Sequence, residues 1–400
     1  MKIALLWPYY WPYVRRGGER MVHDHAVYLA SRGHTVHILA SKPGPGSVER
    51  KGLITIYRFP EVDHPLLRFY ADRLGRYYDP FDAHSFQVLP LLLRERYDLL
   101  HLFIYHHGPS VRLVERLRGM PWAYHILFIP PYAPRAGDQA RLCHCLRDGV
   151  PVRVFSRYCA EHIRQEYGVP SVIIPPTVDT TLFHPLGPKD TTRPKILFTA
   201  DLSEPRKGAE ILVRAFNEVH RACPRAVLQL AGPIGFQPAG VKQLLGLVEP
   251  AARSSVEVLD AGALKDVPQL YRDAALTVLP SLDEAFGMVI SESLASGTPV
   301  VGADSGALPE LIDDPSVGSL FARTGDTEES AHNLAVAILH TLEVARDPAV
   351  TERCRQHAQR WTWSRVGPAF DAYQEAAQRG PAHLRTLVRQ PTGFPAEIYA

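Results

Sequence analysis

Short apolar runs alternate with helical patterns along most of this 400-residue chain, and few folds accept such an alternation. Runs typical of buried strands cover residues 2–7, 35–40, 53–59, 98–104, 121–128 and 151–155. The same rhythm resumes at residues 195–200 and continues to residues 319–322. Strands separated by helices predict parallel, doubly wound sheets. We therefore expect an α/β protein with two such sheets.

The division between the two sheets is expected at residues 184–194, which are rich in Pro, Gly and Thr and show no period. We place one domain at residues 1–187 and a second at residues 193–360, with residues 361–400 as a helical segment and tail. A hydrophobic content of 46% is enough for each domain to bury a core.

Charge, cysteine content and apolar run length exclude several classes of function. A net charge of +2 lacks the basic surplus that nucleic acid binding requires. The five cysteines show no framework spacing, which is typical of a reducing compartment. No apolar run reaches the roughly 20 residues of a membrane span, and residues 1–11 have the pattern of a buried strand rather than a signal peptide. We expect a cytoplasmic protein.

Two open parallel sheets that face each other form a cleft, and ligands bind such sheets at the carboxyl ends of their strands. After the first strand, Gly17 and Gly18 precede a helix whose first amides could receive an anion. The alternative is a glycine pair that only permits a tight turn.

The most informative stretch covers residues 275–312, where a strand ends and a helix begins. Glu284 falls in the loop and Glu292 inside the helix. A diphosphate between hydroxylated rings suits this pattern, because amides bind phosphate oxygens and carboxylates accept hydrogen bonds from sugar diols. The alternative is a pair of ordinary carboxylates at a helix start. The amides concerned belong to Phe286, Gly287, Met288 and Val289.

Glu284 and Glu292, followed by Gly297, resemble the E-x7-E signature of retaining GT-B glycosyltransferases of family GT4. Other stretches resemble family motifs in the same order along residues 1–378. They are the Gly17–Gly18 pair and residues 32–36, 97–101, 121–125, 155–158, 176–183 and 205–208.

The resemblance implies a GT-B fold, with two Rossmann-like domains facing across a cleft and residues 361–400 crossing back to the first domain. It also implies transfer of a sugar from a nucleotide-diphosphate sugar to a hydroxyl acceptor, with retention of configuration. Glu284 would hold the sugar hydroxyls, Glu292 the ribose, and Lys207 the diphosphate.

Five further positions receive roles from the same resemblance. Gly17 or Gly18 would approach the phosphate or acceptor from the first domain, and Ala263 and Leu264 would contact the base. His125 would lie beside the sugar carbon under attack. The alternative for His125 is a buried strand histidine satisfied by a backbone carbonyl.

One position departs from the family pattern. The family usually has Gly-Arg after the first strand of the second domain, whereas this chain has Ala200 and Asp201. Either Arg206 supplies the missing charge or donor binding is weakened. The second possibility would make the protein a catalytically weak GT-B binding subunit.

The expected chemistry requires no metal and no cofactor, because the leaving diphosphate can itself take the acceptor proton. The chain has no Asp-x-Asp motif, and the Cys143-His144-Cys145 run lacks a second ligand pair for zinc.

Acceptor recognition is expected in aromatic-rich loops of the first domain, at residues 7–13, 64–81 and 103–108. Residues 64–78 are also basic and amphipathic, so they predict either peripheral contact with the inner membrane face or a solvated helix. A small polar, natural-product or lipid-linked acceptor is compatible with this pattern. The sequence does not predict an oligomeric state.

Overall fold

The structure is a computed structural model of the chain, and its residues group into two compact units. It describes residues 1–12, 17–62, 80–128, 142, 145–146, 150–187, 189–232, 238–259 and 266–389. Unit 1 contains Met1–Phe155, Cys159–Pro175 and the described residues from Gly367 onward. Unit 2 contains Ser156–Tyr158 and Pro176–Val366.

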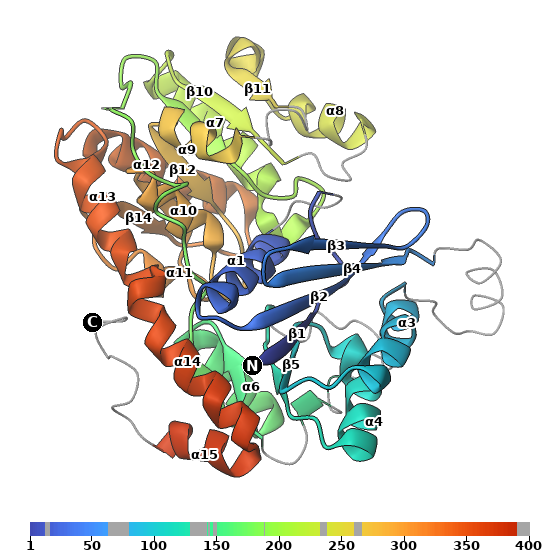
Figure 1. Cartoon of the computed structure of the whole chain (residues 1–400). Helices are drawn as coiled ribbons and strands as arrows, with labels where there is room; N and C mark the ends of the chain where they lie inside the picture. Colours follow the sequence, from blue (N-terminus) through green and yellow to red (C-terminus); the bar gives the residue numbers. More distant parts are fainter. Residues whose placement is uncertain are drawn as a thin grey trace. The chain divides into compact units, whose positions relative to one another are not determined.

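Unit 1 is built on a six-stranded sheet with the order β3-β4-β2-β1-β5-β6 (Figure 1). Its central strand β1 has the apolar sequence KIALL, which suits a parallel strand covered on both faces. All neighbouring pairs are parallel except β3 with β4. The strands are β1 (Lys2–Leu6), β2 (Thr35–Lys42), β3 (Ser47–Lys51), β4 (Ile54–Pro60), β5 (Leu99–Leu102) and β6 (Trp122–Tyr124).

Helices and a small second sheet complete unit 1. The two-stranded sheet of β7 (Val152–Val154) and β8 (Ser171–Ile173) adjoins the main sheet through a bridge between His125 and Arg153. Helix α14 packs closely on α1, since a Cβ at Gly367 would lie 2.5 Å from the Tyr28 hydroxyl. The helical segments are α1 (Gly17–Ser31), α3 (Pro80–Arg94), η1 (Tyr105–His107), α4 (Gly108–Arg118), α6 (Arg157–Tyr167), α14 (Trp363–Arg379) and α15 (Pro381–Arg389), of which α6 and α14 begin with residues of unit 2.

Unit 2 contains a second six-stranded sheet, in which every pair is parallel and the order is β11-β10-β9-β12-β13-β14. In chain order this is 3-2-1-4-5-6, so the winding direction reverses between β9 and β12. The loops that follow these two strands therefore meet at the switch point. The strands are β9 (Lys195–Phe198), β10 (Val227–Leu230), β11 (Val256–Val258), β12 (Leu276–Leu279), β13 (Val300–Ala303) and β14 (Gly318–Phe321).

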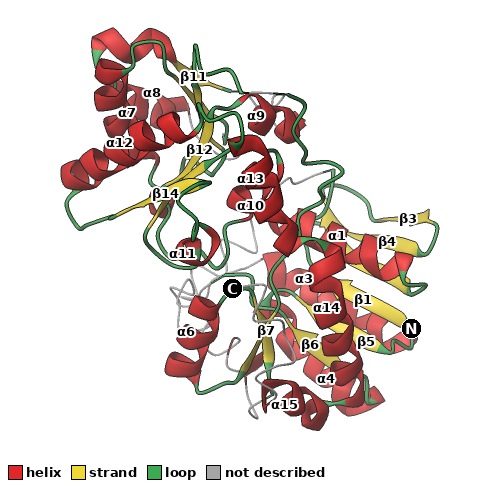
Figure 2. Cartoon of the chain, turned by 90° about the vertical axis from the view of Figure 1, so that its left-hand side faces the viewer, coloured by secondary structure: helices red, strands yellow, loops and turns green. Residues whose placement is uncertain are grey.

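Helices surround the unit 2 sheet, and α7 packs beside α12 (Figure 2). The helical segments are η3 (Pro205–Lys207), α7 (Ala209–Ala222), α8 (Pro238–Gly246), η4 (Pro250–Ser255), α9 (Val267–Asp273), α10 (Met288–Ala295), α11 (Leu308–Leu311), α12 (Thr327–Val344), α13 (Val350–Ala358) and η6 (Gln359–Trp361). Among the described residues, none of the helices has the length and apolar character needed to cross a membrane.

The predicted α/β class with two doubly wound sheets is confirmed. The antiparallel strand β3 was not expected, because four of its five residues, Ser47, Glu49, Arg50 and Lys51, are polar. Gly52, with φ of 59°, makes the turn that brings this edge strand back onto β4. An edge strand can be polar because much of it faces water.

Candidate functional site

Two loops at the switch point of unit 2 are held together by hydrogen bonds to backbone carbonyls. Leu282 N donates to Arg206 O at 3.0 Å, which joins the loop after β12 to η3. Arg323 Nη1 donates to Arg206 O at 2.8 Å and to Pro280 O at 2.5 Å. Gly208 has φ of 74°, and a Cβ there would lie 2.6 Å from Pro280 O. Only glycine therefore allows the two loops to approach this closely.

Three charged side chains, Arg206, Lys207 and Glu284, meet where these loops come together, and we call them the switch-point cluster. Glu284 Oε1 lies 2.5 Å from Lys207 Nζ and 3.2 Å from Arg206 Nη1. The Glu284 residue is 9% exposed. Burial opposes its ionisation, but the Lys207 and Arg206 charges outweigh burial and lower the pKa of the Glu284 carboxyl. The cluster is therefore an ion-paired site with two cations on one carboxylate.

Helix α10 begins beside this cluster. Its N-cap Gly287 has φ of 102°, and a Cβ there would lie 2.8 Å from Leu308 Cδ2. Among the described residues, the Met288 and Val289 amides in the first turn donate to no backbone carbonyl outside the helix. Phe286 is 2% exposed and packs edge-on against Trp361 at 5.8 Å, so only its backbone is available to a ligand. The helix start is thus a positive end with unused donors.

Glu292 lies further along α10 and is 5% exposed. Tyr271 of α9 donates its hydroxyl proton to Glu292 Oε2 at 3.0 Å. The Tyr271 hydroxyl also lies 3.1 Å from Thr199 Oγ1, directly after β9. A connected polar chain therefore leads from the end of β9 to Glu292.

Asp201 occupies the position where the family pattern has arginine. Its Oδ1 accepts from Ser203 N at 2.9 Å and from Ser203 Oγ at 2.6 Å, which makes an Asx turn. Arg206 is engaged elsewhere, because its Nε donates to Glu204 Oε1 at 2.9 Å. The Asp201 carboxylate therefore stabilises the turn in which it lies.

In unit 1, Gly17 and Gly18 are the first two residues of α1, whereas the sequence pattern placed them just before the helix. A Cβ at Gly18 would lie 2.9 Å from Cζ2 of Trp7, the residue that follows β1. Glycine at this position therefore lets the helix start approach the Trp7 indole.

His125 follows β6 and is fully buried. Its Nε2 lies 2.5 Å from His101 Nδ1, and its Nδ1 lies 3.5 Å from Arg153 Nη1. Burial, with the nearby His101 and Arg153 charges, lowers the pKa of His125 well below its usual value. Its expected role beside the sugar carbon stays a prediction.

Some expected residues fall outside the described chain, and some relevant ones were not foreseen. Ala263, Leu264 and residues 64–78 lie outside the described residues. Sequence reasoning missed Tyr271, whose position in a short helix carries no motif. It also missed Gly306, with φ of 63°, where a Cβ would lie 2.5 Å from Glu284 N. A glycine shortly after a strand was the available signal for a close backbone approach.

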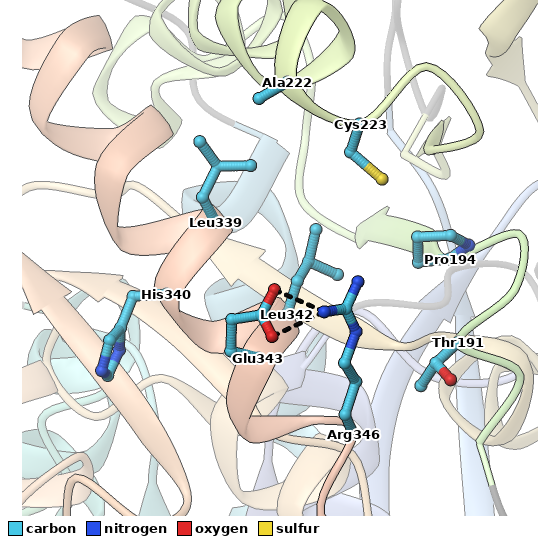
Figure 3. Close-up of a pocket in the computed structure, with 9 residues that line it drawn as sticks. All are labelled: Thr191, Pro194, Ala222, Cys223, Leu339, His340, Leu342, Glu343 and Arg346. Atoms are coloured by element: carbon cyan, nitrogen blue, oxygen red, sulfur yellow. Dashed lines mark hydrogen bonds and ion pairs between the residues drawn. The ribbon is translucent and has the colours of Figure 1, made fainter.

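A pocket of about 350 Å³ lies elsewhere in unit 2, between α7, α12 and the residues before β9 (Figure 3). Its walls include Pro194, which precedes β9, and Cys223, which follows α7. It therefore adjoins the amino end of β9, whereas the switch-point cluster adjoins the carboxyl end. Glu343 and Arg346 in its wall pair with each other at 2.6 Å. No group of three potential metal ligands occurs among the described residues.

Two Rossmann-like units, one with a cationic cluster and a helix start at its switch point, define a protein of the GT-B class. The family described as Glycosyltransferase Family 4 matches residues 15–182, and that described as Glycosyl transferases group 1 matches residues 193–342. The chain therefore belongs to the family 4 glycosyltransferases.

Individual relatives agree with this assignment. The D-inositol 3-phosphate glycosyltransferase of Saccharomonospora viridis is 35% identical over 229 residues, covering 52% of this chain and 51% of that protein. The chain thus spans about half the length of the curated relatives that it matches.

Two solved structures show the same fold over nearly the whole chain. Sucrose-phosphate synthase from Thermosynechococcus elongatus has a TM-score of 0.74 and 22% identity, covering 94% of this chain and 98% of that one. HepE of Anabaena, in complex with UDP and glucose, has a TM-score of 0.68 and 19% identity, covering 93% and 98%.

Proposed function

We propose that this protein is a retaining glycosyltransferase that moves a sugar from a nucleotide-diphosphate sugar to a hydroxyl acceptor. The observation that carries the proposal is the switch-point cluster beside the α10 amino end. Family membership, over residues 15–182 and 193–342, supports it independently.

The donor would bind across the unit 2 switch point. Lys207 and Arg206 offer positive charge, and the Gly287, Met288 and Val289 amides offer hydrogen bonds to the diphosphate. Arg206 also pairs with Glu204, so the diphosphate can replace Glu284 at Lys207 and release Glu284 to accept the sugar hydroxyls. Glu292 would accept the ribose hydroxyls.

In the proposed reaction, the bond between the anomeric carbon and the diphosphate oxygen breaks. The acceptor oxygen bonds to that carbon from the same face, so configuration is retained. The acceptor proton passes to the leaving diphosphate, whose developing charge Lys207 and the helix amides stabilise. This scheme requires no metal and no cofactor.

The acceptor side of the proposal depends on unit 1. Gly17 or Gly18 at the start of α1 would approach the phosphate or the acceptor, and His125 would lie beside the sugar carbon. Ala263 and Leu264 would contact the base. The S. viridis relative is a D-inositol 3-phosphate glycosyltransferase, which favours a small polar acceptor here over a lipid-linked one. Peripheral membrane contact through residues 64–78 stays a prediction, as does a cytoplasmic location.

The alternative of a catalytically weak binding subunit rested on Asp201 in place of arginine. The comparisons give that alternative no support. The Asp201 carboxylate accepts both of its hydrogen bonds from Ser203, so it stabilises its own turn. Arg206 and Lys207 supply two cations to the proposed donor site without an arginine at position 201.

A thermal-shift screen with UDP-, GDP- and ADP-sugars tests the proposal. A ligand at a hundred times its dissociation constant stabilises the folded state by about 2.7 kcal/mol, which is a readily measured shift. UDP-glucose is the first choice, because HepE has been solved in complex with it. We expect one donor class to stabilise the wild type and to be hydrolysed slowly without acceptor. The Lys207→Ala variant should show neither effect. A protein that no nucleotide sugar stabilises would contradict the proposal.

A further inference from the structure

Tyr271 connects three elements of unit 2 around Glu292. It belongs to α9, and its side chain is 1% exposed. Its hydroxyl contacts Glu292 Oε2 on α10 and Thr199 Oγ1 after β9, at 3.0 Å and 3.1 Å. The single buried phenol thus joins the proposed ribose ligand to the switch point.

The direction of these hydrogen bonds follows from proton count. A phenol has one proton, and Tyr271 donates it to Glu292. The contact with Thr199 must then be donated by the threonine hydroxyl. Thr199 therefore donates to Tyr271, and Tyr271 donates to the Glu292 carboxylate. We call this chain of two hydrogen bonds the relay.

The backbone of Tyr271 is fixed as firmly as its side chain. Its carbonyl oxygen accepts from Lys189 Nζ at 3.2 Å and from Thr298 Oγ1 at 2.6 Å. Thr298 lies in the turn after α10, so the carboxyl ends of α9 and α10 are joined through this residue. Phe183 packs edge-on against the Tyr271 ring at 5.9 Å. The hydroxyl therefore has a defined position relative to Glu292.

We propose that Tyr271 is a positioning residue for nucleotide binding, which holds the Glu292 carboxylate in the orientation that accepts the ribose hydroxyls. The inference rests on the proposed function, because it takes Glu292 as the ribose ligand. A carboxylate already fixed before binding loses less side-chain freedom when the nucleotide arrives.

The test is titration calorimetry. The wild type is first titrated with UDP, GDP and ADP, and the variants are then titrated with the nucleotide that binds most tightly. Tyr271→Phe removes one oxygen and keeps the ring, so we expect affinity to fall about three- to tenfold. Thr199→Val removes the relay donor and should weaken binding about two- to threefold, whereas Thr199→Ser should bind as the wild type. Melting temperatures without ligand identify any variant that fails to fold.

A double variant separates positioning from general structural support. We expect Tyr271→Phe to have no further effect on affinity once Glu292→Ala is present. With the donor sugar, Tyr271→Phe should raise KM and leave kcat within about twofold. Wild-type affinity in Tyr271→Phe, or an equal loss in both backgrounds, would overturn the inference while the proposed function stands. Wild-type affinity in Glu292→Ala would remove Glu292 as the ribose ligand, and with it the basis of the inference.

Discussion

Glu284 pairs with both Lys207 and Arg206, so we expect its negative charge to stabilise unit 2. Glu284→Gln keeps the shape of the side chain and removes the charge. Lys207 and Arg206 would then lie close together in a largely buried site without the negative charge of Glu284 between them.

The size of the effect follows from the distances. At 2.5 Å to Lys207 and 3.2 Å to Arg206, the attractions amount to about 7 and about 5 kcal/mol at an effective dielectric of 20. Desolvation offsets most of this sum. Removing one partner of a buried pair costs about 3 to 5 kcal/mol, and an exposed pair contributes at most about 1 kcal/mol. The three side chains are 12–19% exposed, so we expect Glu284→Gln to lower the free energy of unfolding by about 2 to 4 kcal/mol.

Scanning calorimetry with and without saturating UDP measures the effect. Glu204→Gln is the matched control, because Glu204 pairs with the same Arg206 at 2.9 Å and its side chain is 33% exposed. It should lower stability by less than about 1 kcal/mol. UDP should raise the melting temperature of Glu284→Gln more than that of the wild type, because its diphosphate restores negative charge beside Lys207.

The pH dependence gives an independent check with a definite sign. The cations lower the pKa of Glu284 in the folded state, so its stabilisation is present above the unfolded value near 4.3 and is lost as pH falls through the lower folded value. Wild type and Glu284→Gln should therefore converge in stability at acid pH. Equal melting temperatures at neutral pH, together with equal UDP shifts, would refute this reasoning.

Further variants at Lys207, Asp201, Glu292 and Lys189 test other parts of unit 2. Lys207→Ala should abolish nucleotide-diphosphate binding in calorimetry. Asp201→Ala should change the affinity less than about threefold, because the Asp201 carboxylate accepts its hydrogen bonds within its own turn. A tenfold gain in nucleotide affinity in Asp201→Arg would contradict this expectation. Glu292→Ala should weaken binding of the nucleoside diphosphate about ten- to 150-fold, and an affinity equal to that of the wild type would reject the assignment of Glu292 to the ribose. Burial lowers the pKa of Lys189 to about 8, so between that value and about 10.4 only the unfolded state keeps the proton. Wild-type stability relative to Lys189→Met should then rise by up to about 3 kcal/mol between these pH values in urea unfolding, and an unchanged difference would oppose it.

Much of the fold was predictable because parallel strands covered on both faces are continuous apolar runs. The strands β1, β5 and β9 fall inside runs identified in the sequence, and β2 extends two residues beyond the run at 35–40. The polar strand β3 was not predictable, since its register comes from pairing with β4 rather than from its own pattern. β8 has three residues, too few to show a period.

The candidate site was predictable where a motif fixes local geometry. Glu284, Gly287 and Glu292 belong to one strand-loop-helix segment. Their spacing in the sequence therefore predicts which of them lies in the loop, at the helix start and within the helix. The contact of Lys207 with Glu284 joins residues 77 apart and depends on the strand order of the sheet. Tyr271 had no signal, because its role comes from the packing of α9 on α10 and not from its neighbours in sequence.

The central claim is transfer of a sugar with retention and without a metal, and NMR of the first product formed tests it most directly. The donor is the nucleotide sugar that gives the largest thermal shift, and the reaction contains EDTA. The spectrum is recorded before the two anomers of the product can interconvert. The account predicts a product that carries the donor's own anomeric configuration, formed at an undiminished rate. An inverted product, or a rate lost with EDTA and restored by a divalent cation, would contradict it.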